Sequence, residues 1–209
     1  MESIKELETI QGQDQVQDQD QAQTLISDNF DSLNLNENLL KGIYLHGFTQ
    51  PSKIQIRGIG SINTGKDCIL QSQSGTGKTA TYLLGILNRL EPTEKSCQGI
   101  IITPTRELAT QVFDVANKLS KYTNYKITKC TGGTDINQNR NELKTASVVI
   151  GTIGRIYHMI NEKKINIHKI KFIVLDEADD MLSDGISDNL KDTFEKAPSG
   201  IQVILISAT

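Results

Sequence analysis

The sequence predicts an α/β fold in which a mostly parallel β-sheet is covered by helices on both faces. Short, continuous apolar runs alternate along the chain with segments of helical periodicity. A strand that is buried on both faces is apolar throughout, and successive parallel strands need a long crossover, usually a helix. The 209 residues, 37% of them hydrophobic but only 5% aromatic, suit one large or two small soluble domains built on aliphatic packing.

The predicted elements follow one another from residue 36 onward. A first helix spans 37–46, behind an asparagine that can cap its N-terminus. The apolar runs that we expect to be strands are 68–71, 100–103, 126–130, 148–150, 172–175 and 203–206. Helical patterns between them lie near 78–90, 106–120, 136–144, 153–162 and 186–196. In such sheets a ligand binds at the carboxyl ends of the strands, which is where the polar motifs of this chain fall.

Residues 1–29 differ from the rest of the chain in composition. They carry seven acidic residues and one lysine, a net charge of −6, whereas residues 30–209 carry a net charge of +3. Residues 11–23 have glutamine at every odd position, so neither face of a strand would be apolar and burial could not offset the entropy of ordering. We therefore expect a disordered leader at 1–29 and a folded domain at 30–209.

Composition excludes several classes of protein. No apolar run approaches the roughly 20 residues that cross a bilayer, and the acidic N-terminus is unlike a secretory signal. The three cysteines are far apart and lack a Cys-x-x-Cys pair, which argues against a metal knuckle or a disulfide framework. We expect no membrane association and a cytoplasmic location, with the nucleus as the alternative. The mildly basic folded part allows a local phosphate-binding patch.

The stretch QSQSGTGKTA follows the first predicted strand and opens the next helix. Backbone N–H groups of a small-residue turn and of a helix N-terminus form a cradle for an anion. Lys78 can reach the β- and γ-phosphates of a nucleotide, and the Thr79 hydroxyl can bind Mg²⁺. The generic phosphate-loop pattern has glycine at position 72, so a plain glycine turn is the alternative. The candidate nucleotide-binding residues are Ser72, Gln73, Ser74, Gly75, Thr76, Gly77, Lys78 and Thr79.

The stretch FIVLDEADDML places acidic residues directly after another predicted strand. Asp176 would face the same sheet edge as the phosphate loop, as a carboxylate that holds Mg²⁺ must. Glu177 is the candidate that orients or deprotonates an attacking water. A solvated strand end or a helix cap is the alternative. We therefore expect Lys78, Asp176 and Glu177 to be catalytic, and Thr79 and Asp176 to be the metal ligands.

Asp-Glu-Ala-Asp at 176–179 is the signature string of the DEAD-box RNA helicases, and the chain resembles that family over about residues 30–209. GFTQPSKIQ at 47–55 resembles the family's Q motif, with Phe30 as the isolated upstream aromatic residue. Further motifs appear in family order: PTRELA at 104–109, Gly-Gly at 132–133, GTIGR at 151–155 and SAT at 207–209. Three stretches, LLKGIYLHGF, QSQSGTGKTAT and VILISAT, are most similar to members that act in translation initiation and at exon junctions.

The resemblance implies a RecA-like P-loop domain that binds ATP with Mg²⁺ and also binds RNA. Phe48 would stack on the adenine ring and Gln55 would bind its polar edge; core packing is the alternative for Phe48. Contacts with RNA phosphates, made without reading the base sequence, would come from Pro104, Thr105, Arg106, Gly133, Thr152, Gly154 and Arg155. An ion pair at a helix start is the alternative for Arg106. ATP hydrolysis would be coupled to RNA binding through Asp179, Ser207 and Thr209.

Two residues depart from the family pattern. Ile153 stands where the family usually has proline, which fixes φ and removes an N–H donor. We therefore expect the loop around Ile153 to be looser or to bind RNA differently. Ser72 stands where alanine is commonest, which is a minor change.

In this family a second RecA-like domain normally follows the SAT motif, and it carries arginines that stabilise the γ-phosphate in the transition state. No such domain follows Thr209 in this sequence. Because an arginine finger contributes ~10³–10⁵ in rate, we expect this chain alone to bind nucleotide weakly, to hydrolyse it negligibly and not to unwind duplexes. We expect a monomer whose partners are RNA, the second domain and, as a candidate, a scaffold protein.

Three functions stay open at this point. The leading one is the front half of an RNA-dependent ATPase that unwinds RNA. The second is a catalytically inactive module that docks a partner or competes with a full-length helicase, because the arginine fingers are absent. The third is another P-loop ATPase such as a DNA translocase, against which the Q motif and PTRELA argue.

Overall fold

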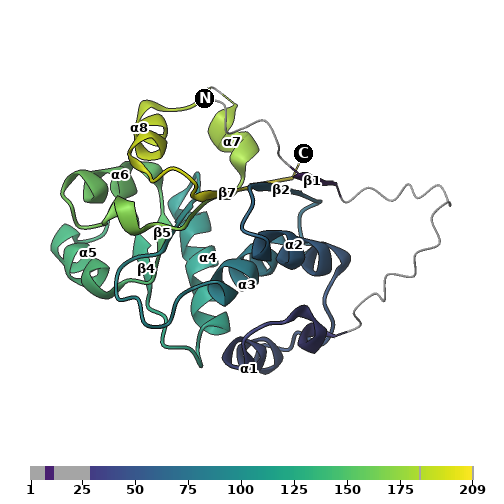
Figure 1. Ribbon diagram of the computed structural model, residues 1–209. Coiled ribbons are helices and arrows are strands. Elements are labelled where there is room, and N and C mark those ends of the chain that lie inside the picture. Colours follow the sequence, from purple (N-terminus) through teal and green to yellow (C-terminus); the bar gives the residue numbers. More distant parts are fainter. Residues whose placement is uncertain (1–7, 12–28, 184, 209) are drawn as a thin grey trace.

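The structure is a computed structural model that describes residues 8–11, 29–183 and 185–208 (Figure 1). A central sheet runs through the molecule, and helices lie on both of its faces. The α/β architecture predicted from the sequence is therefore confirmed. Most of the leader expected to be disordered lies outside the described residues, as does Thr209.

The sheet has seven strands in the order β1-β2-β7-β6-β3-β5-β4, and every neighbouring pair is parallel. The strands are β1 (Glu8–Gln11), β2 (Cys68–Gln71), β3 (Gly99–Ile102), β4 (Ile127–Cys130), β5 (Val148–Gly151), β6 (Phe172–Leu175) and β7 (Gln202–Ser207). All six predicted strands are present, and their ends agree with the prediction to within one residue. Strand β1 was not predicted; it lies within the 1–29 segment and pairs with the edge of β2.

Eight α-helices and three short 3₁₀ helices are present in the described ranges. The α-helices are α1 (Glu37–Leu45), α2 (Lys53–Asn63), α3 (Lys78–Asn88), α4 (Arg106–Leu119), α5 (Ile136–Glu142), α6 (Ile153–Asn161), α7 (Ala178–Leu182) and α8 (Asp188–Lys196). The 3₁₀ helices are η1 (Phe30–Leu33), η2 (Leu143–Thr145) and η3 (Ile167–Lys169). Helices α2 and α7 were not predicted: α2 contains two glycines, which lower helix propensity, and α7 has only five residues.

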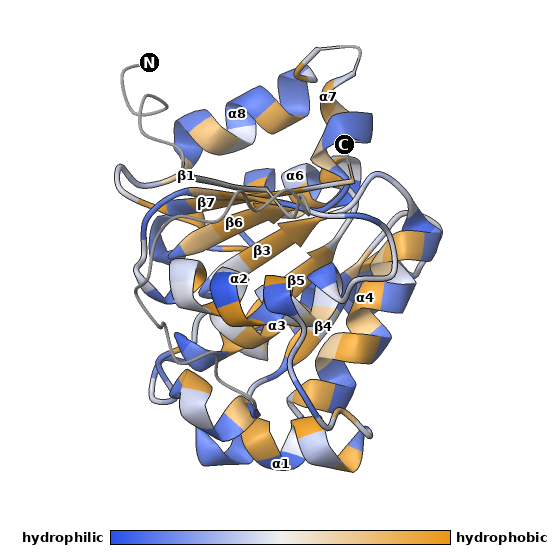
Figure 2. Cartoon of the chain, turned by 90° about the vertical axis from the view of Figure 1, so that its right-hand side faces the viewer, coloured by the Kyte–Doolittle hydropathy of each residue, from blue (hydrophilic) through white to orange (hydrophobic). Residues whose placement is uncertain are grey.

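The sheet divides the core into two clusters (Figures 1 and 2). Because side chains alternate along a strand, Ile101 of β3 packs with helices α1 to α4, whereas Ile100 and Ile102 pack with α6, α7 and α8. All three are fully buried. Burial of each such side chain contributes about 1.5–3 kcal/mol to stability, which is why the strand is apolar on both faces.

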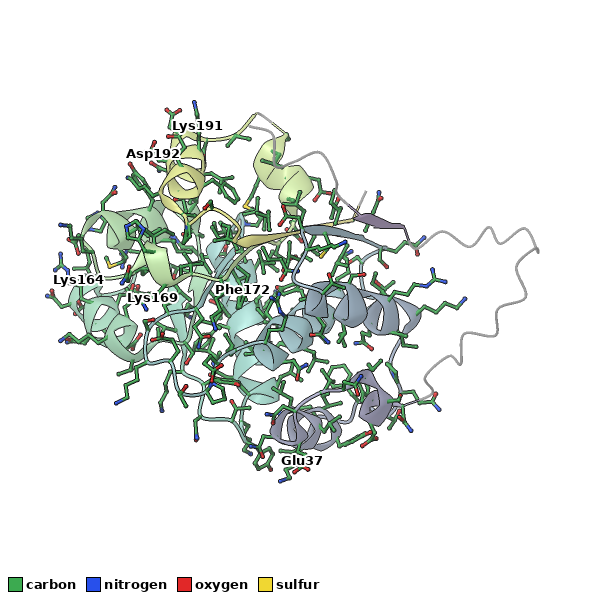
Figure 3. All side chains as sticks on the ribbon, in the orientation of Figure 1. Glu37, Lys164, Lys169, Phe172, Lys191 and Asp192 are labelled. Atoms are coloured by element: carbon green, nitrogen blue, oxygen red, sulfur yellow. The ribbon has the colours of Figure 1, made fainter. Side chains whose placement is uncertain are left out.

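Phe172 shows how closely neighbouring strands pack. It begins β6, next to Gly99 of β3, and it is buried, whereas charged residues labelled in Figure 3 such as Lys164 and Lys191 are exposed. A Cβ atom at Gly99 would lie 1.9 Å from Cε2 of the Phe172 ring. The aromatic ring therefore occupies the space that a side chain at position 99 would need.

The parallel arrangement brings three strand ends to one edge of the sheet. In register, Gln71 at the end of β2 lies beside Ser207 of β7, and Leu175 at the end of β6 lies beside Leu205 of β7. The segments that follow β2 and β6 are the predicted phosphate loop and the acidic cluster. In the described part of the chain, no helix is both long and apolar enough to span a lipid bilayer.

Candidate functional site

A cavity of about 360 Å³ lies at the carboxyl ends of β2, β6 and β7. It brings together eight of the predicted site residues: Ser74, Gly75, Gly77, Lys78, Thr79, Asp176, Glu177 and Ser207. Four further residues line it that the sequence did not single out: Leu108, Gln111, Ile206 and Ala208. The phosphate loop and the acidic cluster therefore face the same space, as the strand pattern predicted.

The phosphate loop is closed by its own hydrogen bonds. Gly75 and Gly77 have φ of 81° and 96°, a left-handed conformation that glycine adopts without strain. The Thr76 hydroxyl donates to the carbonyl oxygen of Gln73 at 2.8 Å. The Lys78 ammonium group donates to the carbonyl oxygens of Ser72 and Gln73, the latter at 3.1 Å. The cation is thus held at the turn where a phosphate would bind.

Ser72 fits the place where the generic loop has glycine. In the described ranges, the non-glycine residues with positive φ are Asn34, Lys163 and Glu177, so Ser72 needs no glycine-specific conformation. Its hydroxyl lies 2.6 Å from the Thr76 hydroxyl, and its N–H donates to the carbonyl oxygen of Ser207 at 3.3 Å. The latter bond ties the start of the loop to the end of β7.

The Q motif packs directly on the phosphate loop. Gln55 is only 3% exposed, and its Oε1 accepts a hydrogen bond from the Ser52 N–H at 2.8 Å. The Ser52 hydroxyl in turn donates to the carbonyl oxygen of Thr76 at 3.0 Å. A Cβ atom at Gly77 would lie 2.9 Å from Gln55 Nε2. The Q motif and the phosphate loop are therefore in direct contact, so a shift of one would displace the other.

The two aromatic residues of this region have different environments. Phe30 is fully buried, and its ring meets the Phe48 ring edge-on, with the centroids 6.4 Å apart. Phe48 is only partly buried and packs against the core cluster that lies between the sheet and helices α1 to α4. Neither ring lines the cavity directly. Phe30 therefore supports Phe48 from the core side.

Asp176 is a buried carboxylate with a donor on each oxygen. It is 5% exposed; Oδ2 accepts from the Tyr82 hydroxyl at 2.7 Å, and Oδ1 accepts from the Glu177 N–H at 3.1 Å. Burial raises the pKa of Asp176, while the Tyr82 and Glu177 hydrogen bonds and the charge of Lys78 act in the opposite direction. The Lys78 charge is thus close enough to act on Asp176.

Glu177 lies in a strained position beside Asp176. Its φ and ψ are 52° and 53°, in the left-handed region, at the residue that precedes α7. The backbone of an L-residue other than glycine pays roughly 1–2 kcal/mol there, and such strain is concentrated at functional sites. The pKa of its carboxyl is raised, first by burial and then by the neighbouring charge of Asp176.

The donor atoms in the cavity fit a magnesium ion that arrives with a nucleotide. Among the described residues, no group of three or more His, Cys, Asp or Glu side chains could hold a metal by itself. Mg²⁺ in nucleotide sites takes one or two protein oxygens and fills its other positions with phosphates and water. The Asp176 carboxylate and the Thr79 hydroxyl line the same cavity and supply oxygens of that kind.

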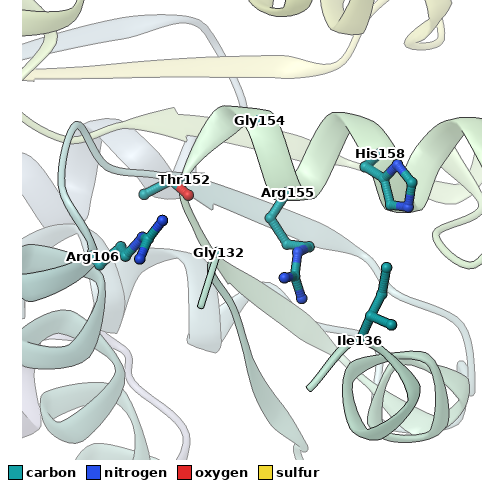
Figure 4. A pocket seen from close by; sticks show the side chains of 7 residues that line it. All are labelled: Arg106, Gly132, Ile136, Thr152, Gly154, Arg155 and His158. Carbon is teal, nitrogen blue, oxygen red and sulfur yellow. The ribbon is translucent and has the colours of Figure 1, made fainter. Parts of the chain in front are cut away.

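A second cavity, of about 480 Å³, lies between α4, the Gly-Gly loop and α6 (Figure 4). It is lined by Arg106, Gly132, Ile136, Thr152, Gly154, Arg155 and His158. In the view of Figure 4, Gly132 lies between the side chains of Arg106 and Arg155. Ile136 and His158 were not predicted. The structure thus gathers predicted RNA-binding residues from two separate motifs around one space, with Gly132 of the Gly-Gly loop beside them, whereas the predicted Gly133 does not line it.

Arg106, the first residue of α4, packs on the backbone of the Gly-Gly loop. A Cβ atom at Gly132 would lie 2.8 Å from its Nη2, and one at Gly133 would lie 2.8 Å from its Nη1. Gly133 also has a φ of 82°. Both glycines are therefore needed for the guanidinium to approach this loop.

Arg155 and Thr105 make hydrogen bonds within the protein. Arg155 donates to Asn139 Oδ1 at 2.8 Å and to the carbonyl oxygen of Thr134 at 3.2 Å, which joins α6 to α5 and to the segment after the Gly-Gly pair. The Thr105 hydroxyl caps α4 by accepting from the Leu108 N–H at 3.1 Å. Pro104, just before it, is partly buried. Arg155 lines the second cavity, whereas Pro104 and Thr105 do not.

Ile153 occupies the first position of α6. The preceding Thr152 is extended, with φ of −93° and ψ of 146°, and the helix begins at Ile153. The N–H of a first helical residue has no partner within the helix, so proline and isoleucine both fit there. The Ile153 side chain packs against the core cluster that the sheet shares with α6, α7 and α8, and this contact helps to fix the start of the helix.

The third group of predicted residues is only partly described. Ser207 lines the first cavity, and α7, which contains Asp179, packs against β7. Thr209 lies outside the described residues.

Comparison with known proteins agrees with these motifs. The family model for DEAD/DEAH box helicases matches residues 52–209. This chain belongs to that family. Its RecA-like fold is that of the N-terminal domain, as shown by a solved DEAD box protein from the hyperthermophile Methanococcus jannaschii: the TM-score is 0.80 at 36% identity, over 88% of this chain and 50% of that one.

Other relatives resemble the chain over a similar span. Eukaryotic initiation factor 4A from Drosophila melanogaster is 48% identical over 185 residues, which are 88% of this chain and 46% of the relative. Dbp5 from S. cerevisiae, solved bound to RNA and ADP BeF3, has a TM-score of 0.76 at 34% identity over 88% of this chain and 47% of that one. A Dbp5 variant solved with Gle1 and IP6 has a TM-score of 0.74 at 35% identity over the same shares. The chain spans about half the length of these relatives.

Gln111 is the polar residue of the first cavity that sequence reasoning missed. It lies on α4 together with Leu108, one helical turn earlier, and both line the cavity. Residues three apart share a helix face, so a helix over this segment by itself implies that these two point the same way. It did not predict which face of α4 turns toward the phosphate loop, because that depends on tertiary packing.

The backbone of Glu177 gives a testable prediction. Because glycine adopts positive φ without a Cβ penalty, Glu177→Gly should unfold in urea with a free energy about 1 kcal/mol higher than Glu177→Ala. Asp180, inside α7, is the matched control: there the glycine variant should be the less stable of the two by roughly 0.5–1 kcal/mol. The same order of stability at both positions would contradict a left-handed Glu177.

Proposed function

We propose that residues 30–209 are the ATP- and RNA-binding front half of a DEAD-box RNA helicase that acts like initiation factor 4A. One observation carries the proposal: Lys78, Thr79, Asp176, Glu177 and Ser207 come from three separate strand ends and line one cavity. A glycine turn or a solvated acidic strand end, the alternatives for the two motifs, gives no reason for this convergence.

ATP is the proposed nucleotide, and each part of the site has a task. Residues 72–77 offer backbone N–H groups to the phosphates, and Lys78 exchanges its carbonyl partners for β- and γ-phosphate oxygens. Phe48 stacks on the adenine ring, and the Gln55 amide binds its polar edge. The support for Gln55 is its place against Gly77, which couples the base pocket to the phosphate loop.

The proposed reaction is attack of water on the γ-phosphate. Mg²⁺, when bound through Thr79 and Asp176, neutralises the charge that develops on the phosphate oxygens. Glu177 orients the water and accepts its proton; its raised pKa suits a group that must take up a proton. Asp179, Ser207 and Thr209 would link this step to RNA binding, and the contact between α7 and β7 supports a link of that kind.

RNA is the proposed second ligand, bound through its phosphates rather than by its base sequence. Pro104, Thr105 and Arg106 would form one side of the contact, and Gly133 with Thr152, Gly154 and Arg155 the other. The second cavity supports this proposal because it combines two guanidinium groups with exposed glycine backbone. The solved Dbp5 complex with RNA supports it by analogy.

The complete cycle needs a second RecA-like domain, since the arginines that stabilise the γ-phosphate are expected there. We propose a cytoplasmic monomer that meets RNA and this domain, with the nucleus as the alternative location. A scaffold protein is a further candidate partner, and the relative solved with Gle1 supports that class. A module that only docks such a partner is the competing function, and its binding would not depend on nucleotide.

The decisive variant for this function is Lys78→Ala. The substitution removes the cation of the phosphate loop, so titration calorimetry with ATP and Mg²⁺ should show a loss of affinity of at least about tenfold. Lys66→Ala is the matched control, because Lys66 precedes β2 and lies at the other end of that strand. ATP binding of equal strength in both variants would exclude the phosphate-loop function.

RNA binding has its own variant, Arg106→Ala. The loss of one phosphate contact should weaken single-stranded RNA equally for all base sequences and lower the slope of log K against log salt by roughly one. Fluorescence anisotropy at several salt concentrations measures both effects. Lys118→Ala, at the opposite end of α4, should leave both unchanged. An equal loss in the two variants would show only a general charge effect.

A further inference from the structure

Tyr82 reaches the proposed site through Asp176. It lies on α3, one helical turn after Lys78, and its side chain is 0% exposed. Its hydroxyl donates to Asp176 Oδ2 at 2.7 Å, across 94 residues of sequence. Tyr82 does not line the cavity, so a bound nucleotide would not touch it. No sequence motif pointed to this residue.

The hydrogen bond to Asp176 accounts for the hydroxyl of Tyr82. Tyr82 packs among apolar side chains such as Leu83 and Ile86, where the ring of a phenylalanine would fill nearly the same space. A buried hydroxyl costs free energy unless it is hydrogen-bonded, and here it donates to a carboxylate.

The two donors on Asp176 fix the orientation of its carboxylate. The Glu177 N–H holds Oδ1 and the Tyr82 hydroxyl holds Oδ2. Each carboxylate oxygen has two lone pairs, so both oxygens can accept these bonds and still face a cation or a coordinated water. A metal ligand that is fixed in this way before the ion arrives loses less entropy on binding.

We propose that Tyr82 is a positioning residue that holds the Asp176 carboxylate in the orientation in which it binds Mg²⁺, or a water ligand of Mg²⁺, in the nucleotide complex. This inference rests on the proposed function, because it needs Asp176 as the magnesium residue. Magnesium binding would then depend on a residue of α3 that lies outside the phosphate loop.

The test is Tyr82→Phe, which keeps the ring and removes the hydroxyl. Calorimetry of the 1–209 chain with a non-hydrolysable ATP analogue, at Mg²⁺ concentrations from an EDTA blank to excess, gives the magnesium dependence of binding. We expect Mg²⁺ to bind ~10–100-fold more weakly, as is typical when the partner of a metal ligand is lost. Affinity for the analogue in EDTA should be unchanged.

Tyr157→Phe is the matched control. The Tyr157 hydroxyl donates to Asp192 Oδ2 at 2.8 Å, so this variant also loses a tyrosine–aspartate hydrogen bond, but away from the first cavity. Its magnesium dependence should equal that of the unaltered chain.

A double-mutant cycle separates positioning from packing. If Tyr82 acts through Asp176, Tyr82→Phe should cause no further loss in an Asp176→Asn background. A residue that only packs the core would cause the same loss in both backgrounds. Thermal unfolding of each variant shows whether the fold is retained, and the cycle stays informative if Tyr82→Phe is less stable.

The outcomes distinguish this inference from the function on which it rests. Unchanged magnesium affinity in Tyr82→Phe, or an equal loss with and without Mg²⁺, overturns the positioning role and leaves the proposed function intact. Failure of the unaltered chain to bind the analogue overturns the proposed function, and the positioning role with it.

Discussion

The alignment of strand ends is the constraint on which the whole site depends. Because β2, β7 and β6 are neighbours and parallel, the segments that leave β2 and β6 emerge at the same edge. Lys78 and Asp176 are far apart in sequence, yet the positive charge of Lys78 acts to lower the pKa of Asp176. The sheet thus brings a cation, a carboxylate and the backbone of the phosphate loop to one place, which a chain without this topology could not maintain.

The contacts around this edge join the parts of the site to one another. The phosphate loop is bonded to β7 through Ser72 and to α2 through Ser52, and α3 reaches the acidic cluster through Tyr82. These hydrogen bonds hold the phosphate loop, β7 and the acidic cluster in contact with one another. Contacts of this kind are those through which the proposed coupling between nucleotide binding and RNA binding would act.

The sequence was informative wherever local chemistry determines structure. Buried parallel strands are continuous apolar runs, so six strands could be placed, and the polar motifs after them predicted eight of the residues that line the first cavity. Strand β1 was not predicted because Glu8–Gln11 lies in an acidic, glutamine-rich segment. Helix α2 was not predicted because its two glycines weaken the helical pattern. Tyr82 and Gln111 could not be predicted, since their contacts depend on how α3 and α4 are rotated against the sheet. Roles assigned by resemblance, such as that of Phe48, stay predictions.

In the proposed complex, a nucleoside triphosphate lies against Lys78 while its metal faces Asp176. A crystal structure of the chain with a non-hydrolysable ATP analogue and Mn²⁺ tests it most directly, because manganese replaces magnesium and is located by its anomalous scattering. We expect one manganese between the phosphates and the Asp176 carboxylate, with the Lys78 amino group on the β- and γ-phosphates. Manganese or phosphates at the amino-terminal ends of the strands would contradict it.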